Sequence, residues 1–186
     1  IGKIQHFIGR KAMDIEGLGG ETVALLYQEG LLSSIADLYR LQPDQILPLE
    51  RMADKSVSNL IEGIEKSKNK PFAKVLFGLG IRFVGETVAK KLSKQFKSIS
   101  ALQQASLEEL IATDDIGERI AKSIVAFFSN PKNQLLISEL KAYGLQLEEV
   151  EEEGLSHAAF EGKRFVVSGV FDNYTREELK KEIETL

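Results

Sequence analysis

The stretch GIRFVGETVAKKL, residues 80 to 92, places a branched apolar residue beside a glycine, Val84-Gly85, immediately before an amphipathic segment. Apolar residues continue at Val88 and Leu92, and this spacing of four is typical of one face of an α-helix. We therefore expect a helix that begins beside Gly85, buries this face and leaves its basic residues in solvent.

Three further segments of the chain repeat this arrangement of an apolar residue, a small residue and a helix. The four apolar-small pairs are Leu18-Gly19, Met52-Ala53, Val84-Gly85 and Ile116-Gly117. Their small residues are separated by 34, 32 and 32 positions. Four positions after each stands another small or β-branched residue: Val23, Val57, Ala89 and Ala121. Four coincidences in register indicate an internal repeat of about 33 residues.

Each repeat is expected to be two short helices joined by a hairpin turn. Helical segments precede the pairs, for example residues 72–80 and 106–114, and Ser106 with Glu109 forms a capping-box pattern. Pro71 suggests a break between the second and third repeats. The apolar residue of each pair would lie in the core. The glycine would permit a backbone conformation that strains other residues, and would let a ligand approach closely.

Unpaired N–H groups at the start of the second helix would point outward in such a unit, backed by the positive end of the helix dipole. A phosphate can bind there, and Lys90 and Lys91 one turn later would add contacts that read no base. A single glycine before a helix is more often only a turn or a cap. Four in register, beside a basic stretch, favour phosphate binding.

Charge is unevenly distributed along the chain, whose formal net charge is −4. Residues 1–147 hold 19 basic and 17 acidic side chains, a balance of +2, and residues 148–186 hold 5 and 11, a balance of −6. Residues 66–97 hold nine basic side chains and one acid, Glu86, a local balance of +8. The net charge therefore does not argue against nucleic acid, because the acidity belongs to the C-terminal part.

Composition limits the class of protein. With 186 residues, 43% of them hydrophobic, the chain is long enough for one or two domains with a core. No apolar run approaches the roughly 18 residues of a membrane span. There is no cysteine, and His6 is expected to pack or cap rather than bind metal. The N-terminus has neither an initiator Met nor a signal-peptide pattern, so we expect an excised piece of an intracellular protein. No nucleophile–base arrangement or dinucleotide fingerprint is present, so no catalytic residue is predicted.

Each repeat resembles a helix-hairpin-helix motif, whose usual pattern is hydrophobic-x-Gly-hydrophobic-Gly-x-x-x-Ala. The order of the chain is similar to the C-terminal half of bacterial NAD-dependent DNA ligases over about 146 residues. The stretches that carry this resemblance are HFIGRKAMDIEGLGGETV (6–23), LLSSIADLYRL (31–41), KSVSNLIEGIEKSK (55–68), LFGLGIRFVGETVAKKLSKQF (76–96), IGERIAKSIVAFF (116–128) and PKNQLLISELKAYGLQ (131–146). In that family a four-cysteine zinc module and the catalytic parts lie upstream of the first of these stretches.

The residues EGKRFVVSGVFDNYTREELKKEIETL, 161–186, resemble the start of a BRCT domain, the module that ends these ligases. A strand at 164–171 and a helix capped by Thr175 are expected. One strand and one helix cannot close a core, so residues 148–186 are expected to be mobile or ordered only by other contacts.

The predicted fold is mainly α, with four tandem helix-hairpin-helix motifs packed as two pairs, followed by a truncated α/β BRCT fragment. The predicted domains are a DNA-binding domain at 1–147, an acidic linker at 148–159 and the BRCT fragment at 160–186. The pattern leaves open whether the four hairpins close into one body or two hinged pairs.

The resemblance implies sequence-independent binding of duplex DNA through the minor groove and the phosphate backbone, around a nick between a 3′-hydroxyl and a 5′-phosphate, in replication and repair. It implies NAD, Mg²⁺ and Zn²⁺ for the parent ligase and no cofactor for this chain. The implied partners are nicked DNA and the remaining ligase domains, at the bacterial nucleoid in the cytoplasm, with no membrane. The residues expected to bind DNA are Gly17, Gly19, Gly20, Lys55, Arg82, Gly85, Thr87, Lys90, Lys91 and Gly117.

Two repeats depart from the family pattern. Ala53 stands where glycine is usual and should bind phosphate less well, and Asp114 and Asp115 flank the fourth turn and would repel a phosphate. We therefore expect the first and third hairpins to make the stronger contacts.

Two alternatives remain open. One is a tandem helix-hairpin-helix subunit of another DNA repair complex, and the other is a helical protein-interaction scaffold whose hairpins are only turns.

Overall fold

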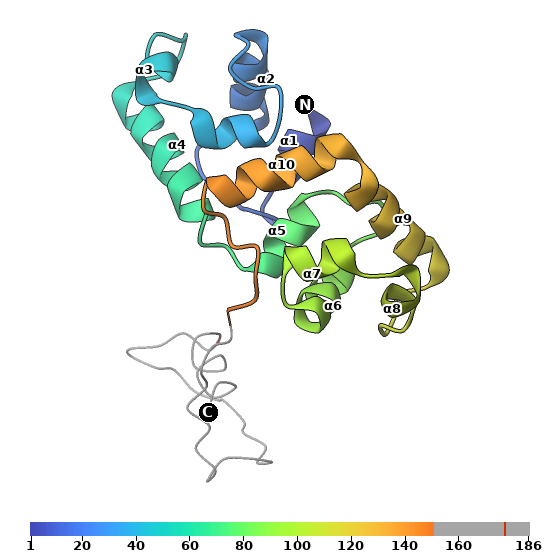
Figure 1. The fold of residues 1–186 in the computed structure, drawn as a ribbon. Coiled ribbons are helices and arrows are strands. Elements are labelled where there is room, and N and C mark those ends of the chain that lie inside the picture. The colour runs from blue at the N-terminus through green and yellow to red at the C-terminus, as the bar shows by residue number, and fades with distance from the viewer. Residues whose placement is uncertain (151–176, 178–186) are drawn as a thin grey trace. The chain divides into compact units, whose positions relative to one another are not determined.

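The computed structural model describes residues 1–150 and Glu177, and the predictions for the BRCT-like residues and for most of the acidic linker lie outside this part. Within residues 1–150 the fold is helical, with no named strand (Figure 1). The helices are α1 (Gly2–Ile8), α2 (Gly20–Gln28), the 3-10 helix η1 (Ala36–Arg40), α3 (Pro43–Ile46), α4 (Asp54–Ser67), α5 (Phe72–Gly78), α6 (Glu86–Phe96), α7 (Ile99–Gln104), α8 (Leu107–Ile111), α9 (Glu118–Ser129) and α10 (Pro131–Ala142). The prediction of a mainly α fold is confirmed. None of these helices is long and apolar enough to cross a membrane.

Four helix pairs correspond to the four predicted repeats: α1 with α2, α3 with α4, α5 with α6, and α8 with α9. The two helices of each pair contact one another. The second helix of each pair begins directly after the small residue of its repeat. Gly19, Ala53, Gly85 and Gly117 are thus the N-cap residues of α2, α4, α6 and α9. Between the second and third repeats the chain breaks after α4 and resumes at α5, directly after Pro71, as predicted.

The apolar positions of the repeat lie in the core, as predicted. Three of the four residues that precede the N-caps are buried, namely Leu18, Val84 and Ile116, and Met52 packs against the core partly buried. The residues four positions after the N-caps are also buried: Val23, Val57, Ala89 and Ala121. Each hairpin is therefore anchored to the core on both sides of its N-cap, which leaves the turn itself at the surface.

Hairpins that are neighbours in the sequence pack on one another, the first on the second and the third on the fourth. A Cβ at Gly63 of α4 would lie 2.6 Å from the carbonyl oxygen of Glu16, so only glycine lets the first hairpin come this close. In the second pair, the Ser123 hydroxyl of α9 donates to the Arg82 carbonyl oxygen at 2.8 Å. Glu16 and Arg82 both stand three residues before an N-cap, so the same position of the turn makes a contact in each pair, although the partners Gly63 and Ser123 stand at different positions of the repeat.

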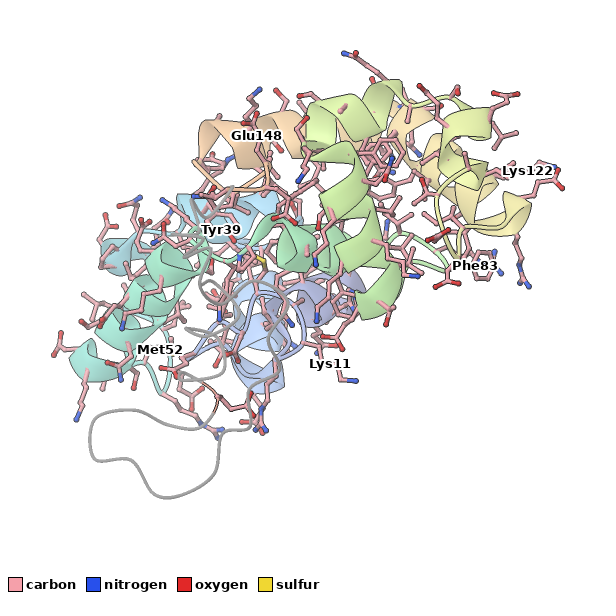
Figure 2. All side chains as sticks on the ribbon, turned by 90° about the horizontal axis from the view of Figure 1, so that it is seen from below. Lys11, Tyr39, Met52, Phe83, Lys122 and Glu148 are labelled. Atoms are coloured by element: carbon pink, nitrogen blue, oxygen red, sulfur yellow. The ribbon has the colours of Figure 1, made fainter. Side chains whose placement is uncertain are left out.

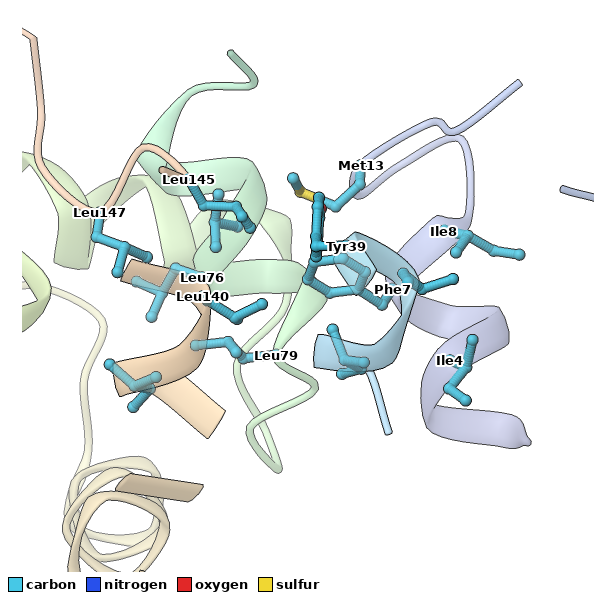
Figure 3. Packing of buried hydrophobic residues seen from close by; sticks show 14 of the residues in the cluster. Ile4, Phe7, Ile8, Met13, Tyr39, Leu76, Leu79, Leu140, Leu145 and Leu147 are labelled. Carbon is cyan, nitrogen blue, oxygen red and sulfur yellow. The ribbon is translucent and has the colours of Figure 1, made fainter. Parts of the chain in front are cut away.

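One hydrophobic core joins the two pairs, and Ile1–Glu149 form one compact unit. Figure 3 shows this core extending from Phe7 on α1, past Tyr39, to the leucines of α5 and α10. At the junction of α1 and α5, a Cβ at Gly78 would lie 3.0 Å from Cδ2 of Phe7. Beside it, His6 packs its ring on Phe77, with 4.8 Å between centroids, and its Nε2 lies 2.9 Å from the Phe77 carbonyl oxygen.

Polar and aromatic contacts fasten α10 to the first pair. Arg40 of η1 donates through Nε to the Tyr143 hydroxyl at 2.6 Å and through Nη2 to Glu139 at 2.5 Å. The Tyr39 ring stacks on Tyr143, with 6.2 Å between centroids. The Tyr39 hydroxyl is within 3.0 Å of Ser67 Oγ, and burial raises the pKa of Tyr39 to about 12, so this hydroxyl stays neutral. The end of the helical unit is thus tied to its beginning.

The first residues of the predicted acidic linker belong to this unit. Glu148 forms an isolated antiparallel bridge with Ser98. The amide of Glu149 donates to the Lys97 carbonyl oxygen at 2.7 Å, and its carboxylate accepts from Ser93 Oγ at 2.6 Å. The expectation that the chain is a solvated linker from residue 148 is therefore wrong for Glu148 and Glu149.

Candidate nucleic-acid interface

All four hairpin turns share one backbone conformation. Two residues before each N-cap the chain takes a positive φ, at Gly17 (81°), Arg51 (67°), Phe83 (68°) and Asp115 (63°). The N-cap residues are extended, with φ of −84°, −88°, −84° and −76°. The expectation that glycine is needed at the N-cap to permit a strained backbone is therefore wrong, because any residue adopts such a φ. The demanding position lies two residues earlier.

The glycines at the N-caps instead leave space on the outside of the molecule. A Cβ on Gly19, Gly85 or Gly117 would meet no heavy atom within 4 Å, so nothing within the described part of the chain requires glycine there. At Gly17, by contrast, a Cβ would lie 3.1 Å from the Cα of Leu60, and φ is positive. The fold therefore requires Gly17, whereas the three N-cap glycines keep the start of each helix open to close approach from solvent.

The amide groups at these helix starts are available as donors. No side chain caps α2, α4, α6 or α9. In α6 the Gly85 carbonyl oxygen accepts from the Ala89 amide at 2.9 Å, which leaves the amides of residues 86–88 without a partner from the preceding turn. Together with the positive end of the helix dipole, these donors form a surface suited to an anion. Thr87, predicted to contribute to the third hairpin, lies exposed in this first turn.

The predicted basic residues differ in their availability. Lys90 is exposed one turn into α6, and Lys55 is exposed in the first turn of α4. Lys91 instead forms an ion pair with Asp115 of the fourth hairpin. Arg82, Thr87 and Lys90 are therefore all exposed on the third hairpin, whereas Lys91 is engaged within the molecule.

An acid stands in the first turn of each second helix, where it would weaken an anion site. At the third hairpin this acid is neutralised. Glu86 accepts from Lys74 Nζ at 3.1 Å and lies 4.0 Å from Lys11 Nζ. The hydrogen bond from Lys74 lowers the pKa of Glu86 below its ordinary value, so the carboxylate remains ionised but compensated.

The acids in the first helical turns of the other three hairpins are compensated unequally. Glu118 at the fourth hairpin pairs with Lys122 at 2.5 Å, and this hydrogen bond lowers the pKa of Glu118. Glu21 and Asp54, in the first turns of α2 and α4, have no basic partner within 4.0 Å among residues 1–150. Electrostatics therefore favours the third hairpin as the anion site, with an exposed lysine and a compensated acid.

Two residues that the sequence analysis did not single out lie at the third hairpin, Phe83 within its turn and Arg119 beside it. Phe83 is 39% exposed, and the guanidinium of Arg119 from α9 lies 4.0 Å from the centroid of its ring. Figure 2 shows Phe83 at the edge of the molecule, close to α9. The signal for Phe83 was in the motif itself, because Phe83 stands where the pattern usually has its first glycine.

No metal centre accompanies these hairpins. Among residues 1–150 the structure contains no group of three or more histidine, aspartate or glutamate side chains that could hold a metal ion.

Comparison with known proteins agrees with this geometry. Residues 74–137 match the helix-hairpin-helix motif family, and this match covers the third and fourth hairpins. Over nearly its whole length, the chain is similar to a segment of bacterial DNA ligases. The DNA ligase of Flavobacterium johnsoniae is 62% identical over 185 residues, 99% of this chain, and that of Christiangramia forsetii is 61% identical over 186 residues. The DNA ligase of Phocaeicola vulgatus is 55% identical over 184 residues. The chain spans 28% of the length of each of these three relatives. The resemblance inferred from the motifs is confirmed.

Proposed function

We propose that this chain is the DNA-holding region of a bacterial NAD-dependent DNA ligase and binds duplex DNA without regard to its sequence. The observation that carries the proposal is the repetition of one hairpin geometry four times, each with an uncapped helix start. Three of the four starts are left bare by glycine. The likeness to proteins named DNA ligase over 99% of the chain supports the assignment to a ligase.

The third hairpin makes the strongest contact in this proposal. The amides of residues 86–88 donate to a phosphate oxygen, and Gly85, which has no side chain, lets the phosphate come close to the backbone. Lys90 adds a positive charge to the positive end of the helix dipole. Arg82 and Thr87 lie on the same hairpin. Phosphates carry no sequence information, so these contacts fix the position of the duplex without reading bases.

The remaining predicted residues distribute over the other hairpins. Gly19 and Gly20 form the start of α2, Lys55 lies in the first turn of α4, and Gly117 caps α9. We assign Gly17 to the fold of the first hairpin rather than to a DNA contact. Lys91 reaches a phosphate only if its ion pair with Asp115 opens.

The contribution to ligation is positioning. Hairpins that grip the minor groove on both sides of a nick hold the 3′-hydroxyl and the 5′-phosphate aligned for the remaining ligase domains, which lowers the entropic cost of the reaction. NAD, Mg²⁺ and Zn²⁺ belong to this proposal only for the whole ligase. Residues 1–150 contain no group of three or more histidine, aspartate or glutamate side chains that could hold a metal ion. The BRCT-like residues 160–186 likewise form part of the proposal for the whole protein.

Fluorescence anisotropy of the 186-residue chain tests this function, with a nicked and an intact labelled duplex of unrelated sequence at low and higher salt. We expect similar affinities for the two duplexes and a steep fall of affinity as the salt concentration rises, because the contacts go to phosphates. The double variant Gly85→Asp with Lys90→Glu should weaken binding at least about tenfold, because it places two carboxylates at the proposed phosphate site.

A charge-matched control separates this effect from net charge. Lys132→Glu with Leu135→Asp changes the charge by the same amount on α10, at two exposed positions outside the hairpins. The control should retain most of the affinity, and both variants should melt close to the parent chain. Absence of binding by the parent chain at low salt would contradict the proposal and favour the scaffold alternative.

A further inference from the structure

The Phe83 side chain lies exposed beside two arginines that come from different hairpins. The guanidinium of Arg82 is 4.9 Å from the ring centroid, and that of Arg119 is 4.0 Å from it. Phe83 is 39% exposed, so its ring is not part of the core. A bulky residue at a φ of 68° is an outlier, and the first hairpin has Gly17 at the equivalent position. Neither burial nor backbone preference accounts for a phenylalanine here.

Both arginines remain available to an external anion. Neither guanidinium has a carboxylate partner within 4.0 Å in the described part of the chain. The acids that neighbour Arg119 in sequence are engaged elsewhere, since Asp115 pairs with Lys91 and Glu118 pairs with Lys122. A guanidinium over an aromatic face keeps its N–H donors for other acceptors.

The position of the cluster is fixed by the packing of the second pair. Ser123 lies one turn after Arg119 on α9, and its hydroxyl donates to the backbone carbonyl of Arg82 at 2.8 Å. The third hairpin is thereby held against α9, and the ring of Phe83 meets Arg119 across the junction. Two positive charges and one apolar ring are thus presented together beside the helix starts of α6 and α9.

We propose that Arg82, Phe83 and Arg119 form a single contact for the minor groove of duplex DNA. The ring packs on the deoxyribose edge, and the two guanidinium groups bind phosphates on either side of it. The minor groove offers apolar sugar edges between rows of phosphates, which matches an apolar side chain flanked by cations. This inference rests on the proposed function, and it gives the fourth hairpin a contact through Arg119 that its acidic turn does not provide.

Anisotropy titrations across a range of salt concentrations distinguish the parts of this contact. Phe83→Gly suits the positive φ, so the variant should melt near the parent temperature, yet bind a nicked duplex about tenfold more weakly with an unchanged salt slope. Arg119→Gln should reduce the slope of log affinity against log salt by about one, because one phosphate contact is lost. Leu135→Ala, which removes an exposed apolar side chain from α10, serves as the matched control and should change neither quantity.

The outcomes separate this inference from the proposed function. If the parent chain binds DNA but Phe83→Gly and Arg119→Gln keep its affinity and slope, the minor-groove contact is wrong and the function stands. If Phe83→Gly lowers the melting temperature, and the loss of affinity is no larger than the loss of folded protein explains, the ring has a structural role and the proposed contact is also wrong. If the parent chain binds no DNA, both proposals fail, and acidic proteins become the partners to test.

Discussion

Each hairpin contains one residue whose backbone conformation is demanding, and in three of the four hairpins a different residue, the N-cap glycine, leaves the surface bare. In the first hairpin both are glycines. Gly17 combines a positive φ with the backbone of Leu60, which lies too close for a side chain. Gly19 has an ordinary φ and empty space around it. The stability of the hairpin should therefore depend on the first glycine, and its affinity for an anion on the second.

Alanine substitutions at these two glycines should have unequal effects on stability. Gly17→Ala should lower the free energy of unfolding by about 2 to 4 kcal/mol, because a Cβ is strained at this φ and clashes with α4. Gly19→Ala should lower it by no more than about 1 kcal/mol, the usual cost of alanine at an N-cap. Ala53 occupies the same position in the second hairpin. Urea unfolding followed by circular dichroism measures both, and equal losses would refute this division of roles.

The motif could be read from the sequence, but the division of roles within it could not. The positive-φ position is occupied by Arg51, Phe83 and Asp115 in the other three repeats, and these residues conceal the need for a left-handed backbone. From the sequence, the need for a left-handed backbone was therefore assigned to Gly85 and Gly117, although the residues that adopt it stand two positions earlier. Only the dihedral angles separate a glycine kept for its backbone from one kept for its missing side chain.

At the scale of elements, α6 and the fourth hairpin are coupled by charge. Lys91 of α6 pairs with Asp115 in the turn that precedes α9. The pair compensates an acid that would repel a phosphate, and at the same time withholds a lysine that would attract one. We therefore expect the acidic turn of the fourth hairpin to restrain the proposed DNA binding by the third.

Asp115→Asn should strengthen binding of the chain to duplex DNA. The substitution removes a negative charge and releases Lys91, and asparagine tolerates the positive φ of this residue. We expect affinity to rise about threefold to tenfold at low salt, with a salt slope steeper by about one. Anisotropy at several salt concentrations provides both numbers.

Asp114→Asn is the matched control for this prediction. It removes the same charge from the neighbouring residue, which has no ion pair within 4.0 Å among residues 1–150. Its effect should be smaller, and its salt slope should stay that of the parent chain. If the two variants behave alike, the release of Lys91 contributes nothing and only net charge matters.

Sequence patterns located these elements better than they located the contacts between them. The starts of the four second helices, the break before Pro71 and the capping box of Ser106 with Glu109 are all present. The Lys91–Asp115 pair was not foreseen, because it depends on how α6 meets a turn 24 residues later. Periodicity describes the face of one helix and contains no information on which neighbour that face meets.

At the scale of the whole molecule, the two pairs of hairpins share one core. The junction is built from the close approach of Gly78 to Phe7, the tilted ring contact of His6 with Phe77 and the Arg40 contacts to α10. The sequence left open whether the pairs are hinged, because a glycine at the end of a helix is compatible with either a cap or a close contact. A shared core fixes the spacing of the four helix starts, which the proposed clamp on a rigid duplex requires.

Gly78→Val should destabilise both pairs of hairpins together. A Cβ at residue 78 already lies 3.0 Å from the Phe7 ring, so valine overpacks the junction and should lower the free energy of unfolding by about 1 to 3 kcal/mol. Amide hydrogen exchange should show the same loss of protection in the slowest amides of α2 and α4 as in those of α6 and α9, because one core unfolds as one unit. Gly2→Val, at a position where a Cβ meets nothing, should leave all four helices unchanged. Loss of protection in α6 and α9 alone would show that the first pair is stable without the second, and that the clamp is hinged at this junction.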